Sequence, residues 1–382
     1  MRNKILLFLS ITSFSVVFCA HAQFGIIKKG NGDGNSEKNY PLDLSQANDD
    51  FERGNLAEIP NKLKPGIDNK GFTKEERIRV RRLLTMVYLF SDNEPAAEIE
   101  LIKLLKEEPE HPINELTDPE EFKFLYRKFR TRPIFRISVN FGLNKTRPNT
   151  IDLFATTDLT NADNAIESGE LFSPKIGVQY GLTIEREFGF KGLEASLGVM
   201  MAGKSYKMED NIIEGEEPTE ANRDPDPFSK LQFTDAATYL DIPLSIRYNI
   251  DIKKKIIPYV FAGVEANLLL TSSRKDGQRS GAQTISTSVQ DLKTSNERTS
   301  QNYSLIGGVG FKYKLKTHFF KFELKYSNGM TNVIDPENRY VDQTTVFRLA
   351  HVDNNQSLNV VSANFGYIRS IYNPKKFKKY RK

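Results

Sequence analysis

Cysteine and tryptophan are almost absent from this chain of 382 residues, which has one cysteine, Cys19, and no tryptophan. A disulfide framework and a zinc site made of cysteines are therefore excluded. Long apolar runs are also missing beyond the first segment, because no later stretch reaches the roughly 18 residues that a spanning helix requires. With 38% hydrophobic residues and a mean hydropathy of −0.48, the chain is not a membrane protein of many helices.

A strong excess of one charge is missing as well. Lys and Arg together number 54, Asp and Glu number 49, and the formal net charge is +5. For a chain of this length that excess is too small to indicate a nucleic-acid-binding surface. Gly307, Gly308 and Gly310 fall inside an expected strand and not before a helix, where a phosphate-binding loop would be. We therefore expect no nucleic-acid partner and no cofactor.

The first residues are predicted to be a targeting segment. A basic start and an apolar run over 5–18 precede Ala20-His21-Ala22, which is the pattern of a secretory signal peptide over residues 1–22. Lipidation of Cys19 is the alternative, but Phe18 stands where a lipoprotein signal needs a small residue. The chain is therefore expected to fold in the cell envelope.

A flexible polar linker is predicted over 23–40 and a helical domain over 41–132. Ala47, Phe51 and Gly54 lie at helical spacing, and this stretch resembles one half of a tetratricopeptide repeat. The resemblance implies short antiparallel helices that stack in units of about 34 residues. Two readings stay open for this domain: a small helical bundle without a ligand, and a groove that binds a peptide.

Two helix starts can be placed from their capping residues. Thr73 and Glu76 have the spacing of a capping box. Asp118 followed by Pro119 predicts an N-cap and the first helical residue of a later helix.

From residue 134 onward apolar residues recur at every second position, which predicts strands. In Phe135, Ile137, Val139 and Phe141, for example, apolar side chains alternate with polar or small ones. Eight such segments follow one another, over 135–144, 176–185, 193–201, 239–248, 259–270, 303–314, 320–327 and 361–367.

The connections between these strands alternate in length. Short links at 188–192, 250–254 and 316–317 alternate with long ones at roughly 146–172, 206–230, 272–300 and 329–356. Short turns on one side and long polar loops on the other are typical of an outer-membrane barrel. Because the number of strands is even, both ends of the chain and the helical domain are expected in the periplasm.

The polar face of the strands contains ten charged residues, five acids and five bases. These are Arg136, Glu185, Glu194, Asp241, Arg247, Glu265, Lys312, Lys321, Glu323 and Lys325. An eight-stranded barrel is filled by its own side chains, and a buried charge is costly unless it is paired. We therefore predict a structural network of ion pairs in place of a water-filled pore. A path for protons or small ions is the alternative.

Candidate chemistry is sparse. His351 with Asp353, and Ser357 nearby, is the one arrangement that could form a hydrolase site at the rim of the barrel, but a solvated loop histidine is the default expectation. The acidic residues between 209 and 226 could bind calcium, yet the fixed spacing of a calcium loop is missing. We predict no catalytic and no metal site.

The chain ends in a basic tail over 374–382, of which the last eight residues hold six basic ones. A flexible solvated tail is the simplest expectation. Contact with anionic lipid headgroups or with a periplasmic partner is the alternative.

Two short motifs in the middle of the strand region carry a family resemblance. Tyr239-Leu240-Asp241-Ile242-Pro243-Leu244 with Arg247-Tyr248, and then Pro258-Tyr259-Val260-Phe261-Ala262-Gly263, resemble the central hairpin of the PorT-like (and more broadly OmpA-like) outer-membrane barrels of Bacteroidetes-type bacteria. The resemblance covers roughly 134–372. It implies an eight-stranded barrel, and one namesake member serves the type IX secretion system. The helical domain departs from a minimal barrel of this kind.

The expected fold is an α+β multidomain chain, in which a small all-α periplasmic domain precedes an eight-stranded antiparallel transmembrane β-barrel over 133–373. The expected function is that of a non-enzymatic outer-membrane protein whose helical domain docks an envelope or secretion partner. The alternatives are a barrel that binds or transports a small ligand and, less favoured, a rim hydrolase. The expected partners are outer-membrane lipid and a periplasmic or outer-membrane protein.

Overall fold

The computed structural model describes residues 40–152, 154, 172–188, 192–213, 228–250, 254–281, 287–349 and 351–377. The expected signal peptide, the linker up to residue 39 and the tail from residue 378 lie outside the described residues. No helix in the described part of the chain is both long and apolar enough to cross a membrane.

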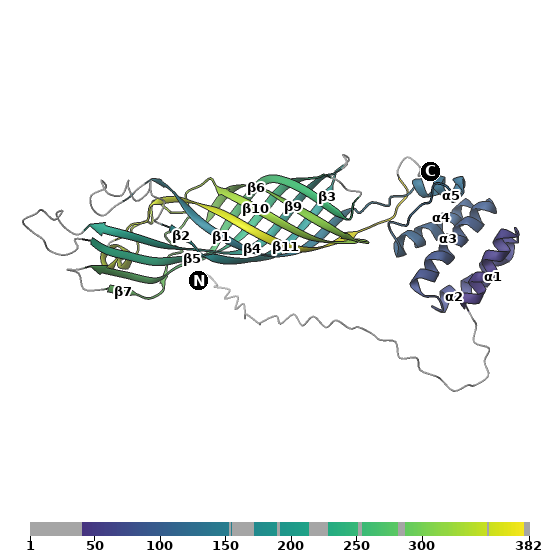
Figure 1. The fold of residues 1–382 in the computed structure, drawn as a ribbon, viewed down its shortest axis with the longest axis horizontal. Helices are drawn as coiled ribbons and strands as arrows, with labels where there is room; N and C mark the ends of the chain where they lie inside the picture. The colour runs from purple at the N-terminus through teal and green to yellow at the C-terminus, as the bar shows by residue number, and fades with distance from the viewer. Residues whose placement is uncertain are drawn as a thin grey trace, which may run out of the picture.

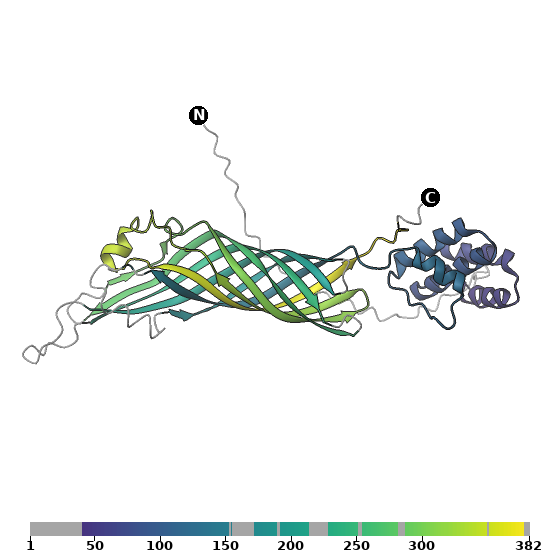
Figure 2. The same ribbon diagram turned by 90° about the horizontal axis from the view of Figure 1, so that it is seen from above.

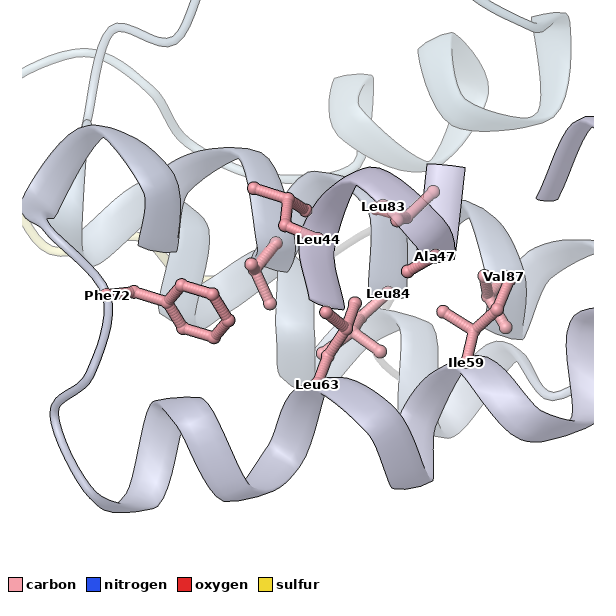
Figure 3. Packing of buried hydrophobic residues seen from close by; sticks show 9 residues of the cluster. Leu44, Ala47, Ile59, Leu63, Phe72, Leu83, Leu84 and Val87 are labelled. Carbon is pink, nitrogen blue, oxygen red and sulfur yellow. The ribbon is translucent and has the colours of Figure 1, made fainter. Parts of the chain in front are cut away.

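The first described segment is helical and lies beyond one end of a long sheet (Figure 1). Its elements are α1 (Tyr40–Glu52), η1 (Leu56–Glu58), α2 (Ile59–Asp68), α3 (Lys74–Phe90), α4 (Glu94–Glu107) and α5 (Glu120–Arg127). Two apolar clusters hold these helices together. Figure 3 shows the first cluster, in which Leu44 of α1, Leu63 of α2 and Leu84 of α3 point toward one another. The second cluster joins α4 and α5 through Leu101, Leu104 and Phe122.

The capping box at the start of α3 is confirmed. The Glu76 amide donates to Thr73 Oγ1 over 3.3 Å, and the Thr73 amide donates to Glu76 Oε2 over 2.8 Å. The predicted N-cap at Asp118 is wrong. Pro119 is the residue that precedes α5, and the Asp118 carboxylate instead accepts from the Arg82 guanidinium and, over 2.9 Å, from the Asn114 amide. Asp118 is therefore used to join the loop to α3.

Eight long antiparallel strands form a closed ring (Figures 1 and 2). They are β1 (Phe135–Asp152), β3 (Ile176–Glu187), β4 (Leu193–Ile213), β5 (Phe228–Asn249), β6 (Ile256–Gly281), β9 (Gln301–Leu315), β10 (His318–Gly329) and β11 (Asn355–Ile371). The order around the ring is β4-β3-β1-β11-β10-β9-β6-β5, and pairing of β4 with β5 closes it. Each ring strand pairs with a neighbour on both sides. The ring therefore has no open edge strand.

The two ends of the ring differ in their connections. At one end, here called the turn end, short links join β3 to β4, β5 to β6 and β9 to β10, and both termini of the ring emerge there. The opposite end, here called the loop end, carries the long connections. The helical segment lies next to the turn end (Figure 1).

In the part of the ring near the turn end, the expected alternation is observed. On β1, Ile137, Val139 and Phe141 are exposed on the outer surface, while Ser138 and Asn140 are buried inside. The same pattern continues on β3 to β6 and on β9 to β11, so the outer surface is an apolar band and the interior is polar. A lipid-facing outer surface and a polar interior are what a membrane barrel requires.

Three of the predicted long loops are partly wrong, because four strands continue far beyond the apolar band. The continuations cover 145–152 of β1, 203–213 of β4, 228–238 of β5 and 271–281 of β6. Three short strands join them: β2 (Phe172–Pro174) pairs with β4, and β7 (Thr287–Val289) and β8 (Leu292–Lys293) pair with β6. Together with the loop segment around α7 (Gln343–Arg348), these parts are here called the extension.

The alternation is reversed in the extension. Tyr206, Met208 and Phe233 are buried inside it, whereas Ser205 and Lys207 point to its outer surface. Apolar side chains that face inward and polar ones that face outward are the arrangement of a protein in water. The extension therefore has the surface of a water-exposed structure, in contrast to the band below it.

Candidate functional site

The barrel interior near the turn end contains one continuous network of ion pairs centred on Glu185. This side chain is fully buried, and its two oxygens contact Arg247 over 2.7 Å, Lys312 over 2.8 Å and Lys321 over 3.4 Å. Lys312 also contacts Glu194 over 2.5 Å. Because one carboxylate bridges three cations from three other strands, the network ties opposite sides of the wall together.

Further side chains extend this network in both directions. Arg247 reaches Glu323 over 3.0 Å, and Tyr259 Oη donates to the same carboxylate over 2.9 Å. Arg136 pairs with Glu194 and, over 3.8 Å, with Glu187. The cations and carboxylates are thus mutually neutralised, as burial in a membrane demands.

A second group of charges lies further toward the loop end. Lys325 contacts Glu265 over 2.5 Å, and Lys204 contacts Asp241 over 3.0 Å. The amide of Asn267 joins the two pairs, because its Nδ2 donates to Asp241 over 2.7 Å and to Glu265 over 3.1 Å.

The structure places all ten predicted interior charges inside the ring and divides them between these two groups. Arg136, Glu185, Glu194, Arg247, Lys312, Lys321 and Glu323 belong to the group nearer the turn end, and Asp241, Glu265 and Lys325 belong to the other. Sequence reasoning missed Lys204 and Glu187. Glu187 stands at the end of an expected strand, and its charge and its spacing from Glu185 were the available signal.

Aromatic rings fill much of the remaining interior. Tyr259 and Phe261 point inward from β6 and lie over Gly310 and Gly308 of β9, where an added Cβ would come within 2.6 Å of either ring. Glycine is therefore needed on β9 to make room. Interior cavities lined by residues of the network and its neighbours have volumes of 30 and 10 Å³. Cavities of this size hold about one or two waters, far less than a solute needs.

The interior of the extension holds a separate polar cluster, which the sequence did not predict. Asp235 accepts from Arg274 over 3.0 Å and from Arg298 over 2.5 Å. Arg274 also reaches Asp353 over 2.6 Å, and all of these side chains are buried. These residues are here called the extension cluster. Apolar clusters lie in the same interior: Val333 and Ile334 pack with Tyr206 and Tyr239, and Leu349 packs with Met208 and Phe233.

Two carboxyl groups in and next to this cluster have pKa values shifted in opposite directions. Burial alone would raise the pKa of Asp353, but the Arg274 guanidinium, the hydrogen bond to His351 and Arg298 hold it well below the ordinary value. Burial raises the pKa of Glu297 to about 7, against the opposing effect of Arg274. Glu297 therefore changes charge near neutral pH.

The expectation that His351 is a solvated loop residue is wrong. His351 is buried, its Nε2 lies 3.2 Å from Asp353 Oδ1, and its ring packs edge-on against Phe233 at 5.0 Å between centroids. No hydrogen bond between described residues joins it to Ser357. Arg274 contacts the same Asp353 carboxylate over 2.6 Å, so this carboxylate is shared between His351 and a guanidinium.

The acidic stretch 209–226 falls largely outside the described residues, which end at 213 and resume at 228. Within the described part, Glu209 pairs with Lys207 and, over 4.0 Å, with Lys230. No group of three or more potential metal ligands is found in the described ranges of the chain.

At the turn end, two chain segments run side by side between the ring and the helices. The segments 128–134 and 371–377, here called the strap, are joined by hydrogen bonds from the Ile134 amide to the Ile371 carbonyl over 2.8 Å and from the Arg130 amide to the Lys375 carbonyl over 3.1 Å. The described part of the basic tail is therefore ordered against the helical domain.

Side chains reinforce this attachment. Glu110 accepts from Lys314 of β9 and from Tyr372 Oη, each over 2.6 Å, and Lys376 reaches Glu98 over 2.5 Å. A cavity of 310 Å³ lies at the junction, lined by residues of both parts such as Tyr126, Arg132 and Phe319. The helical domain is thus held directly beneath the ring.

Comparison with known proteins identifies the family to which this chain belongs. The chain belongs to the family described as outer membrane protein beta-barrel domain, whose model matches residues 131–335. The barrel is therefore an outer-membrane barrel. No match is found among curated proteins.

Solved structures with a similar fold include other outer-membrane proteins. Neisserial surface protein A is 9% identical with a TM-score of 0.30, and the match covers 62% of this chain and 97% of that one. OprG from Pseudomonas aeruginosa is 14% identical with a TM-score of 0.30, covering 63% and 98%. A major outer membrane protein from Thermus thermophilus is 11% identical with a TM-score of 0.29, covering 61% and 99%.

Proposed function

We propose that this protein is a non-enzymatic outer-membrane scaffold whose helical domain lies in the periplasm and docks an envelope protein. The observation that carries the proposal is the strap, with the ion pairs of Glu110 and Glu98, which holds a separate helical unit directly beneath a filled barrel. A filled barrel fixes its position in the membrane without conducting solutes. The helical unit then has a defined place relative to that membrane.

The helical domain has the repeat length expected of a tetratricopeptide-like unit. Helix α3 begins 34 residues after α1, and α4 begins 35 residues after α2. Five large apolar side chains are exposed on this domain: Leu42, Phe90, Ile99, Leu116 and Phe124. Exposed apolar side chains on a helical repeat are common contact points for peptides or partner domains. The PorT-like resemblance makes a secretion component the favoured kind of partner.

Site-specific photo-crosslinking tests the docking. A photoreactive residue at Leu116, which is 95% exposed, or at Ile99 should give one discrete adduct in whole cells. Val341, which is 57% exposed at the loop end, is the matched control and should not give that adduct. Absence of any specific adduct from both helical positions would contradict docking.

The orientation is tested separately by cysteine labelling. The chain has one native cysteine, so an introduced one is seen against a low background. With a membrane-impermeant thiol reagent, Val341→Cys should react in intact cells and Leu116→Cys only after the outer membrane is opened. The reverse pattern would place the helical domain outside.

The two alternative functions each have a direct test. A transport barrel should conduct in planar bilayers, and the small interior cavities predict silence. A rim hydrolase based on His351 would lose lipid or protein processing in His351→Ala, and we expect processing to be unchanged.

A further inference from the structure

Cations gather on one side of the barrel's outer surface, just beyond the apolar band. On β1, Lys145 and Arg147 point outward directly after Leu143, the last apolar residue of the band on this strand. Ile176 of β3 is the register partner of Lys145, and exposed Lys175 directly precedes it.

The neighbouring strand continues this arrangement. Lys207 points outward on β4 and pairs in register with Ser173 of β2, two residues before Lys175. Lys175 lies across β4, because its amide donates to the Ser205 carbonyl over 3.1 Å and its Nζ donates to Thr234 Oγ1 of β5 over 2.8 Å. We call Lys145, Arg147, Lys175 and Lys207 the cationic face.

Among the described residues, two lysines of this face have no carboxylate partner. Lys207 pairs with Glu209, but neither Lys145 nor Lys175 forms an ion pair with a carboxylate of the described residues, and both are exposed. An exposed lysine beside hydrocarbon can bury its stem in the apolar layer and keep its charge in the headgroup layer.

On the other side of β1, the next three strands around the ring are neutral at the corresponding positions. On β11, the register partners of Lys145 and Arg147 are Val361 and Asn359. On β10 and β9 the corresponding outward positions are occupied by Asn328 and Tyr303. The run of cations therefore begins at β1 and does not extend onto β11, β10 or β9 at these positions.

We propose that the cationic face binds the phosphate groups of lipid headgroups in the leaflet at the loop end. Clustered Lys and Arg beside a membrane attract anionic headgroups, and Arg can contact a phosphate through two hydrogen bonds. The phosphate can come from a phosphorylated glycolipid such as lipid A or from a phospholipid. This proposal rests on the orientation given above, because the loop end must face the leaflet that holds the lipid.

The test uses the full chain in nanodiscs of phosphatidylcholine that contain one added lipid. The added lipid is bisphosphorylated lipid A, its dephosphorylated form, or phosphatidylglycerol. Native mass spectrometry after release from the disc reports which lipid stays bound, and heat-modifiability gels confirm that each variant is a folded barrel.

We expect bisphosphorylated lipid A to be retained and its dephosphorylated form to be lost. In the variant Lys145→Gln/Arg147→Gln/Lys175→Gln, retention should fall on the order of tenfold or more, and raised salt should have the same effect on the unchanged protein. Lys255→Gln/Lys316→Gln, which removes two exposed cations at the turn end, is the control and should not alter retention.

The remaining outcomes decide between lipid sources or reject the site. Phosphatidylglycerol held as firmly as lipid A assigns the site to phosphate in general, and lipid A alone assigns it to the glycolipid. Equal retention of phosphorylated and dephosphorylated lipid A, or an unaffected triple variant, overturns the proposal. Docking of a periplasmic partner does not enter this readout, so the two proposals can fail separately.

Discussion

The membrane-embedded part of the barrel and its extension use the same strands with opposite polarity. Below Leu143 of β1, apolar side chains face outward and the interior holds ion pairs around Glu185. Beyond it, Tyr206 and Phe233 face inward, and polar side chains such as Ser205 and Lys207 lie on the outer surface. Four strands, β1, β4, β5 and β6, thus pass from one surroundings to the other. The pairing of β5 with β6 continues across the boundary with a register shift between Thr238 and Tyr239.

This difference shows that alternation alone does not say which side of a strand is covered. In the membrane part, burial of charge against charge fills the interior, because lipid already accommodates the apolar residues. In the extension, the hydrophobic effect drives apolar residues inward, because the outside is water. The extension cluster is a polar network placed within that apolar interior.

The largest effect is expected where the interior of the membrane part is broken. Glu185→Ala removes the carboxylate that neutralises Arg247, Lys312 and Lys321, leaving buried cations unpaired. The free energy of unfolding should fall by about 3–5 kcal/mol, measured by denaturant unfolding in micelles. Arg186→Ala, an exposed position on the same strand, should have little effect. A small loss in Glu185→Ala would mean that water reaches the interior.

A charge placed on the outer surface should distinguish the two regions. Phe141→Arg puts a cation within the apolar band and should destabilise the barrel by about 2–4 kcal/mol if the position lies near the bilayer midplane. Ser205→Arg, on the outer surface of the extension, should cost no more than about 0.5 kcal/mol. Refolding into lipid vesicles measures both. Equal costs would contradict the assignment of the extension to water.

The pH dependence of the extension should be altered by Glu297→Gln. Its folded pKa of about 7 exceeds the ordinary value of 4.5, so the protonated form favours the folded state. The stability from this group is full below about pH 4.5 and is lost as the pH rises through 7. Between those limits the unchanged protein should lose about 1–2 kcal/mol of its free energy of unfolding, and Glu297→Gln should not lose it. Thermal unfolding followed by tyrosine fluorescence measures this.

The matched control for that experiment is Glu337→Gln, an exposed carboxyl of the same loop region. It should leave the pH profile of unfolding as it is in the unchanged protein. A profile that is the same in Glu297→Gln and in the unchanged protein would show that Glu297 is ionised throughout.

The smallest effect on stability is expected at the strap. Lys376→Ala removes the ion pair with Glu98, and a part-exposed pair contributes about 0–1 kcal/mol. The unfolding of the barrel should be unchanged. Spin-label distances between the helical domain and β9 should nevertheless broaden, because one of the side-chain attachments is lost. Lys106→Ala, on the same helical domain, is the control.

The strands of the membrane part were predictable because a lipid-facing strand has an apolar residue at every second position, as in Phe135 to Phe141. Their continuations were not, because the outward apolar residues stop at Met201 of β4 and the apolar residues that follow, Tyr206 and Met208, lie on the other face. Lys204 was missed for that reason, since it stands beyond the last outward apolar residue. The pairing of Arg274 with Asp353, 79 residues apart, depends on loop conformation and leaves no local signal.

Accessibility along β4 tests the change of solvent most directly. Single spin labels at Leu197, Val199, Met201, Ser205 and Lys207, all outward-facing, can be probed with oxygen, which concentrates in lipid, and with a polar nickel complex, which stays in water. We predict preferential oxygen contact up to Met201 and preferential nickel contact from Ser205 onward. Oxygen-rich surroundings at Lys207, or nickel access at Leu197, would contradict the division of the barrel into a membrane part and a water-exposed extension.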